Sequence, residues 1–333
     1  MDIVTQGLLG GVMAQSVAQR KEKKLATLVG MLAGLLADAD VFIQSASDPL
    51  LSIEYHRHFT HSLLFIPFGA LIAALILFLF LRNKISFPRL YLFSFMGYAL
   101  SGILDACTSY GTHLLWPFTD ERIAWSVISI LDPVFSFILL ITLIVMLMNG
   151  KRQVAIIGMF LATAYLGIGY MQQQRASTEM AKLLQQRNHT PVKLVIKPTL
   201  GNILLWRSIY IHNETIYVDA IRPGVFSANK IYQGETAKVL IPEKLSINKA
   251  SPQFRDIQRF VQFSDGFVAV SPVMENVIGD MRYSMFPTSI RPLWGIVLSP
   301  ELLEQPVEYK FFRQQSQSER DLFFSMLKGE SIQ

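Results

Sequence analysis

This chain is poor in cysteine and in charge. Its 333 residues include one cysteine, Cys107, which excludes an internal disulfide. Only 17% of the residues are charged, and the net charge of +5 is too dispersed to indicate nucleic-acid binding. The sequence has no glycine-rich phosphate loop, no serine nucleophile elbow and no CxxC pair, so these three kinds of site have no support.

Hydrophobic residues are abundant, at 51% of the chain, and they are concentrated in residues 1–171. The remainder has the composition of a soluble protein. The length predicts about two domains, so we expect a transmembrane helical domain at 1–171 and a soluble domain at 172–333. Segments of about 20 residues cross the roughly 30 Å of membrane hydrocarbon as helices. We predict five such helices, at 25–43, 62–81, 89–107, 130–149 and 153–171.

Residues 3–19 are a weaker candidate for a sixth membrane helix. They are rich in Gly, Ala and Ser but contain Gln6, Gln15 and Gln19. This pattern predicts a short N-terminal helix, half-buried or re-entrant, that packs through small residues. A cleaved signal peptide is not expected, because the basic cluster follows the apolar stretch.

Basic residues are grouped in three loops, and this grouping predicts the orientation. The groups are Arg20, Lys21, Lys23 and Lys24; Arg82, Lys84 and Arg89; and Lys151 and Arg152. By the positive-inside bias, all three loops should be cytoplasmic. The opposite loops, 44–61 and 108–129, have only Arg57 and Arg122 as permanent cations. The soluble domain is therefore predicted to be extracytoplasmic.

Three of the six histidines lie within His56–His61, directly before the most apolar stretch. The predicted orientation puts this segment on the same side of the membrane as Asp38, Asp40 and Asp105. Ionisable residues cost about 2.5–3.5 kcal/mol each at the bilayer centre, and a divalent cation would offset that cost. Imidazole and carboxylate ligands together suit zinc first and manganese second.

We predict a metal site with Asp38, His56, His61 and Asp105 as ligands. Because Asp38 and Asp40 lie about 200° apart on a helix, Asp40 should instead be the catalytic base or orient a histidine. Arg57 is predicted to contact an anionic substrate oxygen. A metal with an open position supplies hydroxide at neutral pH, so hydrolysis is the natural reaction.

Four neighbouring residues have simpler interpretations. Thr60 would cap a helix that begins near His61. His58 taken alone is better explained as a surface or capping residue, and His113 as a loop residue. Asp132 precedes Pro133, and this pair is as well explained by the start of a helix as by a site residue.

Several motifs carry a resemblance to a known family. They are Ala37–Asp40, His56–Ser62, Gly97–Tyr98, Leu104–Asp105, Thr108–Thr112 and Trp116–Phe118. These motifs resemble the YdjM-type membrane-bound metal-dependent hydrolases of bacteria over about residues 1–150, with a weak extension at Asn202–Arg207. The resemblance implies a multi-pass protein of the bacterial inner membrane that is labelled a metal-dependent hydrolase.

This chain departs from the family pattern at two positions. Many relatives have a histidine early in the first helix, where this chain has Thr5–Gln6. They also have one four residues before the aspartate matched by Asp105, where this chain has Ser101. A ligand set without these imidazoles is richer in oxygen and weaker. A non-catalytic member of the family is therefore the alternative.

The soluble half is predicted to be a small α+β domain. Residues 192–196, 203–211 and 215–220 have strand patterns, with a hairpin turn at His212–Glu214. Residues 253–263 and 319–328 have helical patterns, and 172–187 should continue the last membrane helix. No catalytic group of residues is apparent in this half.

The leading functional hypothesis is a metal-dependent hydrolase at the outer membrane–water interface. Its position in the lipid bilayer favours a lipid or headgroup ester as substrate. The alternative is a non-enzymatic membrane protein with a degenerate metal site, whose outer domain binds an envelope partner.

Overall fold

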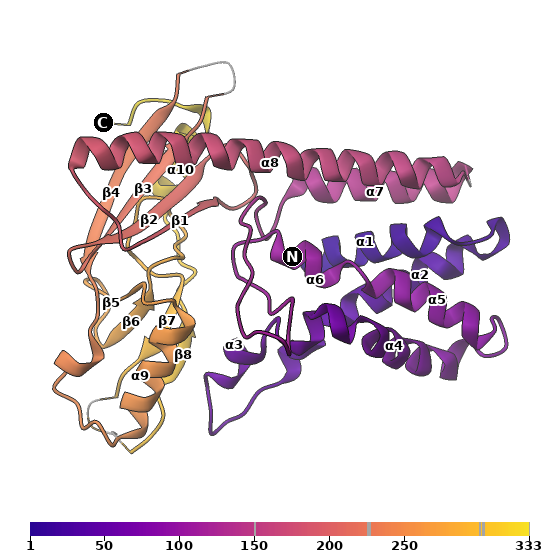
Figure 1. The fold of residues 1–333 in the computed structure, drawn as a ribbon, viewed down its shortest axis with the longest axis horizontal. Coiled ribbons are helices and arrows are strands. Elements are labelled where there is room, and N and C mark those ends of the chain that lie inside the picture. The colour runs from indigo at the N-terminus through magenta and orange to yellow at the C-terminus, as the bar shows by residue number, and fades with distance from the viewer. Residues whose placement is uncertain (150, 225–227, 300, 302–303, 333) are drawn as a thin grey trace. The chain divides into compact units, whose positions relative to one another are not determined.

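The computed structural model describes residues 1–149, 151–224, 228–299, 301 and 304–332. These residues form two compact units, whose elements are labelled in Figure 1. The helical unit comprises Met1–Ile43, Tyr55–Met171 and Leu200–Ile203. The β unit comprises Gln44–Glu54, Gln172–Thr199 and Leu204–Gln333.

The helical unit is built from helices joined by short loops and 3₁₀ turns. Its helices are α1 (Ile3–Ser16), α2 (Lys23–Leu36), α4 (Ile66–Leu81), α5 (Phe87–Tyr98), α6 (Ser101–Ala106), α7 (Pro133–Asn149) and the first part of α8 (Arg152–Arg187). The 3₁₀ turns that matter for the site are η2 (Ala37–Phe42) and η3 (Phe59–His61). The short helix α3 (Leu51–Tyr55) lies where the chain passes between the units.

Within the described residues, three helices are long and apolar enough to cross a membrane: Arg20–Phe42, Leu63–Leu81 and Arg152–Arg187. The predicted count of five is not confirmed. The segment 89–107 is divided into α5 and α6, and α7 has only 17 residues. The division brings Gly102 against the chain at His61, where an added Cβ would lie 2.0 Å from the His61 carbonyl oxygen.

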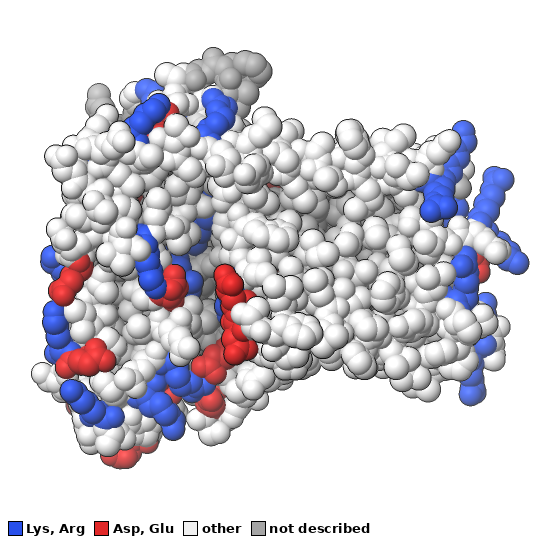
Figure 2. Space-filling view, in the orientation of Figure 1, with Lys and Arg blue, Asp and Glu red and all other residues white. Residues whose placement is uncertain are grey.

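The surface of these helices is that of a membrane protein. Leu79, Phe80 and Phe160 are 72%, 76% and 70% exposed. Figure 2 shows a nearly uncharged surface along the helices and a concentration of Lys and Arg at one end of the helical unit. Apolar surface of this extent is stable in lipid and costly in water.

The basic loops lie together at that end. Arg20, Lys21, Lys23 and Lys24 line a hollow with Leu147 and Met148, which precede the basic pair at 151–152. Arg89, from the remaining basic loop, forms an ion pair with Glu22 at 2.7 Å. The structure thus brings the three basic loops to the same end of the helical unit.

Glycines allow α1, α2 and α5 to pack backbone against backbone. A Cβ on Gly10 would lie 2.3 Å from the Gly30 carbonyl oxygen, and one on Gly97 would lie 2.5 Å from the same oxygen. Only residues without a side chain fit at such a crossing. The prediction that the N-terminal helix packs through small residues is confirmed at Gly10.

The β unit contains two antiparallel sheets. One has the order β1 (Lys193–Pro198), β2 (Trp206–His212), β3 (Thr215–Arg222), β4 (Lys230–Lys238). The other has the order β5 (Val268–Val270), β6 (Val277–Asp280), β7 (Trp294–Val297), β8 (Glu308–Phe311). The helices α9 (Pro252–Phe263) and α10 (Gln317–Lys328) complete the unit.

The predicted secondary structure of this region is largely confirmed. His212 pairs with Thr215, and the two residues between them, Asn213 and Glu214, both have positive φ. This is the conformation that a two-residue hairpin turn requires. The α8 helix extends to Arg187, and α9 and α10 lie where helices are predicted.

Candidate metal centre

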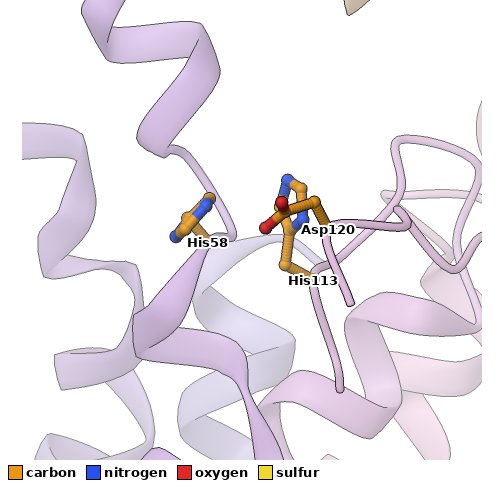
Figure 3. Close-up of side chains that lie close together, drawn as sticks. All are labelled: His58, His113 and Asp120. Carbon is orange, nitrogen blue, oxygen red and sulfur yellow. The ribbon is translucent and has the colours of Figure 1, made fainter. Parts of the chain in front are cut away.

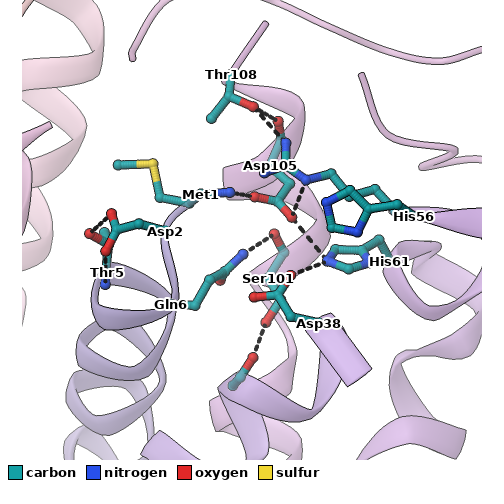
Figure 4. Close-up of polar contacts among 12 residues, drawn as sticks. Met1, Asp2, Thr5, Gln6, Asp38, His56, His61, Ser101, Asp105 and Thr108 are labelled. Carbon is teal, nitrogen blue, oxygen red and sulfur yellow. Dashed lines mark hydrogen bonds and ion pairs between the residues drawn. The ribbon is translucent and has the colours of Figure 1, made fainter. Parts of the chain in front are cut away.

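The described residues contain two groups of His, Asp and Glu side chains that could hold a metal ion. One comprises Asp38, His61 and Asp105, which are drawn with their neighbours in Figure 4. The other comprises His58, His113 and Asp120, drawn in Figure 3. In each group the ligand atoms lie within 4.8 Å of one another. Both groups belong to the helical unit.

The first group is assembled from the ends of three separate elements. Asp38 lies in η2, His61 ends η3, and Asp105 lies in the last turn of α6. His61 Nε2 is 2.9 Å from Asp105 Oδ2 and 3.3 Å from Asp38 Oδ1. His61 and Asp105 are 2% and 0% exposed. Three of the four predicted ligands therefore converge.

The polar atoms at the centre of this group make no hydrogen bond. They are His61 Nε2, Asp105 Oδ2 and Asp38 Oδ2, all buried. Buried polar atoms are almost always hydrogen-bonded, because desolvation without a partner costs free energy. His61 Nε2 and Asp105 Oδ2 face each other at 2.9 Å, and unpartnered atoms this close together form a suitable environment for a cation.

Asp40 lies behind His61 and accepts from several donors. Its Oδ2 accepts from the Arg57 backbone N–H at 2.7 Å and from Thr60 Oγ1 at 2.9 Å. The same oxygen is 3.3 Å from His61 Nδ1. A carboxylate on the far nitrogen fixes the ring orientation and directs the Nε2 lone pair outward. Of the two predicted roles of Asp40, this geometry supports the orienting role.

His56, the fourth predicted ligand, is placed differently. Its Nδ1 lies 3.0 Å from Asp40 Oδ1, and it is not part of the converging group. Burial lowers the pKa of His56, although the hydrogen bond with Asp40 acts in the opposite direction. The imidazole is therefore neutral at neutral pH and could act as a ligand through its other nitrogen. Its role as a ligand stays a prediction.

Arg57 is a buried cation beside the carboxylates. It is 1% exposed, its Nε lies 3.3 Å from Asp105 Oδ2, and its Nη1 donates to Thr108 Oγ1 at 2.8 Å. Its φ of 57° is uncommon for a residue with a side chain and is typical of functional sites. The amino group of Met1 also contacts Asp105. The charge of Arg57 offsets part of the cost of burying the carboxylates.

Gln6 and Ser101, the positions at which the family resemblance leads us to expect histidine, lie at the edge of the group. Gln6 Nε2 is 3.4 Å from the Ser101 carbonyl oxygen, and Gln6 Oε1 is buried without a partner. Figure 4 shows both residues next to Asp38 and His61. Neither Gln6 nor Ser101 donates to the three central atoms.

Two of the simpler interpretations can now be compared with the structure. Ser62, and not Thr60, caps the turn that follows His61, since its side chain accepts from Phe65 N. Thr60 instead donates to Asp40, so its expected capping role is wrong. Asp132 accepts from the backbone of Val134 and Phe135 at 3.1 Å, which is a helix cap.

Sequence reasoning missed Thr108 and Tyr98 as supporting residues. Thr108 receives the Arg57 hydrogen bond, and Tyr98 donates to the Thr60 carbonyl oxygen at 2.6 Å. Both lie in segments that carry the family resemblance, but isolated hydroxyl groups have no spacing pattern that marks a site. Their contacts depend on packing between distant segments.

The second group was not predicted as a site. Burial and the charge of Arg122 lower the pKa of His113 to about 3, and the same two effects lower the pKa of His58. Both imidazoles are thus neutral at neutral pH, as metal ligands must be.

Comparisons with known proteins place this helical site within a family. The family model described as YdjM inner membrane protein matches residues 1–176. The uncharacterized protein YfhP of Bacillus subtilis (strain 168) is 23% identical over 241 residues, which are 72% of this chain and 70% of YfhP. No solved structure matches the chain. The family match covers more than half of the sequence, including all residues of both groups, and the chain belongs to the YdjM inner membrane protein family.

Proposed function

We propose that this protein is a membrane-bound metal-dependent hydrolase, and that Asp38, His61 and Asp105 hold its divalent ion. The observation that carries the proposal is the convergence of one ligand atom each from Asp38, His61 and Asp105, of which His61 Nε2 and Asp105 Oδ2 are buried without a hydrogen bond. One imidazole and two carboxylates form a ligand set that suits zinc first and manganese second.

The residues around these ligands fit such an ion. Asp40 would hold His61 in the tautomer whose Nε2 is free, as carboxylates do behind metal-binding histidines. With three protein ligands, an ion would keep an open position and supply hydroxide at neutral pH. Arg57, held at Asp105, would bind the anionic oxygen of an ester during attack.

We also propose that residues 1–171 are the membrane domain and 172–333 an extracytoplasmic domain. The support is the grouping of the basic loops at one end of the helical unit, which the positive-inside bias assigns to the cytoplasm. Asp38 and Asp105 lie at the ends of α2 and α6 that are remote from those loops. A lipid or headgroup ester therefore fits the site as substrate.

A reporter fused after Gln333 tests this orientation. We expect alkaline phosphatase activity from the fusion, because this enzyme folds only outside the cytoplasm. A fusion of a cytoplasmic reporter at the same position should be inactive. The reverse pattern would contradict the proposed orientation.

One observation favours the alternative, a protein whose metal site is degenerate and whose outer domain binds an envelope partner. Gln6 and Ser101 stand where relatives have imidazoles, and Gln6 Oε1 is left without a partner. One experiment distinguishes the hydrolase from the protein with a degenerate site. The protein, purified in detergent without added metal, is analysed for bound ions and then assayed on chromogenic phosphoesters and carboxyl esters.

We expect the wild type to hold one zinc or manganese ion at Asp38, His61 and Asp105. This ion should be lost in His61→Ala and in Asp105→Asn, so that each variant contains one ion fewer than the wild type and loses metal-dependent hydrolysis. His212→Gln, which removes a half-buried histidine from the β unit, is the control and should change neither result. Retention of the ion in both site variants would refute the ligand assignment. Metal binding without hydrolysis of any ester would support the degenerate site.

A further inference from the structure

A second set of metal-ligating side chains lies outside the site described above. His113 and Asp120 come from one segment and His58 from another, 55 positions earlier, and Figure 3 shows the three side chains close together. The rings of His58 and His113 have centroids 4.4 Å apart and an interplanar angle of 47°. They are therefore not stacked, and their nitrogens can point to a shared position.

His113 is the central residue of this group. It is 7% exposed, and its Nδ1 has no hydrogen-bond partner. A neutral imidazole has its proton on one of its two nitrogens, and the tautomer protonated at Nε2 leaves the lone pair on this unpartnered Nδ1. A ring that donates from one nitrogen leaves a lone pair on the other, which is the arrangement of a metal-binding histidine.

His58 contributes a second unpaired nitrogen. Its Nδ1 is also buried without a hydrogen-bond partner. Aromatic rings surround His58, with centroids 5.4 Å away for Tyr55 and 5.7 Å away for Trp116. Such rings exclude water from one side and offer the imidazole nitrogen no hydrogen-bonding alternative.

The backbone holds the two histidine segments in fixed register. The His113 N–H donates to the Arg57 carbonyl oxygen at 3.0 Å, and the Leu63 N–H donates to the Leu114 carbonyl oxygen at 2.9 Å. His58 and His113 are thus presented by neighbouring strands of chain that are already joined. Asp120 is exposed, so the site can exchange an ion with solvent.

We propose that His58, His113 and Asp120 form a second, zinc-binding site, which ties the segment 107–125 to the His56–Ser62 segment. Two imidazoles and one carboxylate are typical zinc ligands, with bonds of about 2.0–2.2 Å. The ligand atoms lie within 4.8 Å of one another, so small side-chain movements suffice to close them on an ion. The fourth position is left to water. The proposal does not depend on the proposed hydrolase function.

Zinc titration of the full-length chain in detergent tests the proposal. His61→Ala is used as the background, because it removes a ligand of the first group. The protein is stripped with a chelator and titrated with Zn²⁺ in competition with a chromogenic chelator. We expect one zinc equivalent in His61→Ala, and at least tenfold weaker binding after the further change His113→Gln or His58→Gln.

The matched control is the further change His212→Gln, which removes a half-buried histidine that is stacked on His189 in the β unit. Its zinc affinity should equal that of the background. Loss of zinc in this control, or unchanged binding after His113→Gln, would overturn the proposal. So would absence of zinc binding in the His61→Ala background. If, in the otherwise wild-type chain, His113→Gln weakens zinc binding and His61→Ala does not, the result would support this site and contradict the first one.

A second measurement covers the case in which the double variants do not fold. The wild-type chain is treated with a histidine-acylating reagent, with and without Zn²⁺, and the modified residues are identified by mass spectrometry. We expect zinc to reduce modification of His58 at least fivefold and to leave His212 unchanged. Equal modification of His58 under both conditions would overturn the proposal.

Discussion

Replacement of Asp40 by asparagine tests whether this carboxylate orients His61 for metal binding or only stabilises the fold. In the structure, Asp40 Oδ2 serves Arg57 N, Thr60 Oγ1 and His61 Nδ1, whereas Oδ1 faces His56. The amide oxygen of Asp40→Asn can keep the first set of contacts, with its NH₂ group turned towards His56. Because the neutral His56 ring can accept a hydrogen bond, the fold should survive the substitution.

The expected effect is on metal affinity. In the wild type, the negative charge of Asp40 raises the basicity of His61 Nε2 and fixes the tautomer of the ring. The substitution removes this charge. Loss of such a partner typically weakens metal binding about 10- to 100-fold, which corresponds to about 1.4–2.8 kcal/mol of binding free energy. We expect a shift of this size in the Kd for Zn²⁺ or Mn²⁺ measured by chelator competition.

Two controls make the result interpretable. Asp265→Asn carries the same chemical change at an exposed carboxylate of the β unit and should leave the Kd unchanged. The melting temperature of the metal-free Asp40→Asn variant should lie within a few degrees of the wild type. When the second group is disabled by His113→Gln, a Kd for Asp40→Asn within twofold of that of the Asp40 parent would refute the orienting role of Asp40.

Three further predictions concern single positions. Gln6→His should tighten metal binding about tenfold, since it offers an imidazole beside the first group; equal Kd values would show that residue 6 does not reach the ion. Gly30→Ala places a Cβ about 2.3 Å from the Gly10 carbonyl oxygen, so we expect about 1–3 kcal/mol of destabilisation, measured as a lower melting temperature in detergent. Gly167→Ala, where no atom lies within 4 Å of the added Cβ, is its control and should not lower that temperature. Lys197 is buried, has no hydrogen-bond partner, and lies 3.1 Å over the Tyr283 ring, so Lys197→Met should stabilise the β unit by about 1–3 kcal/mol. Burial, with the charge of Arg207, lowers the pKa of Lys197 well below that of free lysine. The unfolded chain thus binds more protons between the two pKa values, and stability rises with pH in that window. Lys197→Met should flatten this rise, and an unchanged pH profile of unfolding would contradict the assignment.

Local patterns account for the parts of the fold that sequence predicted well. The hairpin at Asn213–Glu214 and the helices α9 and α10 depend on residues close in sequence, and each lies where the pattern indicates. The break between α5 and α6 does not. It follows from the close approach of Gly102 to the chain at His61, a contact between segments 41 residues apart.

In the candidate site, too, some features could be predicted from the sequence and others depend on contacts between distant segments. Residue type and helix ends indicated Asp38, His61 and Asp105, because isolated carboxylates and imidazoles are costly near lipid. The same reasoning could not show that His56 faces Asp40 or that His113 lies against His58. Those pairings depend on loop conformation, including the positive φ of Arg57, which has no sequence pattern of its own.

The crossing of α1, α2 and α5 at their glycines is a fixed point from which the positions of two metal ligands can be counted. Asp38 follows Gly30 by eight positions, and Asp105 follows Gly97 by eight positions. Because α2 turns about 100° and rises about 1.5 Å per residue, one residue inserted or deleted between Gly30 and Leu36 would rotate Asp38 away from His61. The number of residues between the helix crossing and the metal ligand is therefore fixed by the geometry of the site. Apolar substitutions at the exposed Leu32 should be tolerated, whereas a single deletion between Gly30 and Asp38 should abolish binding of the ion at His61 with every ligand still present.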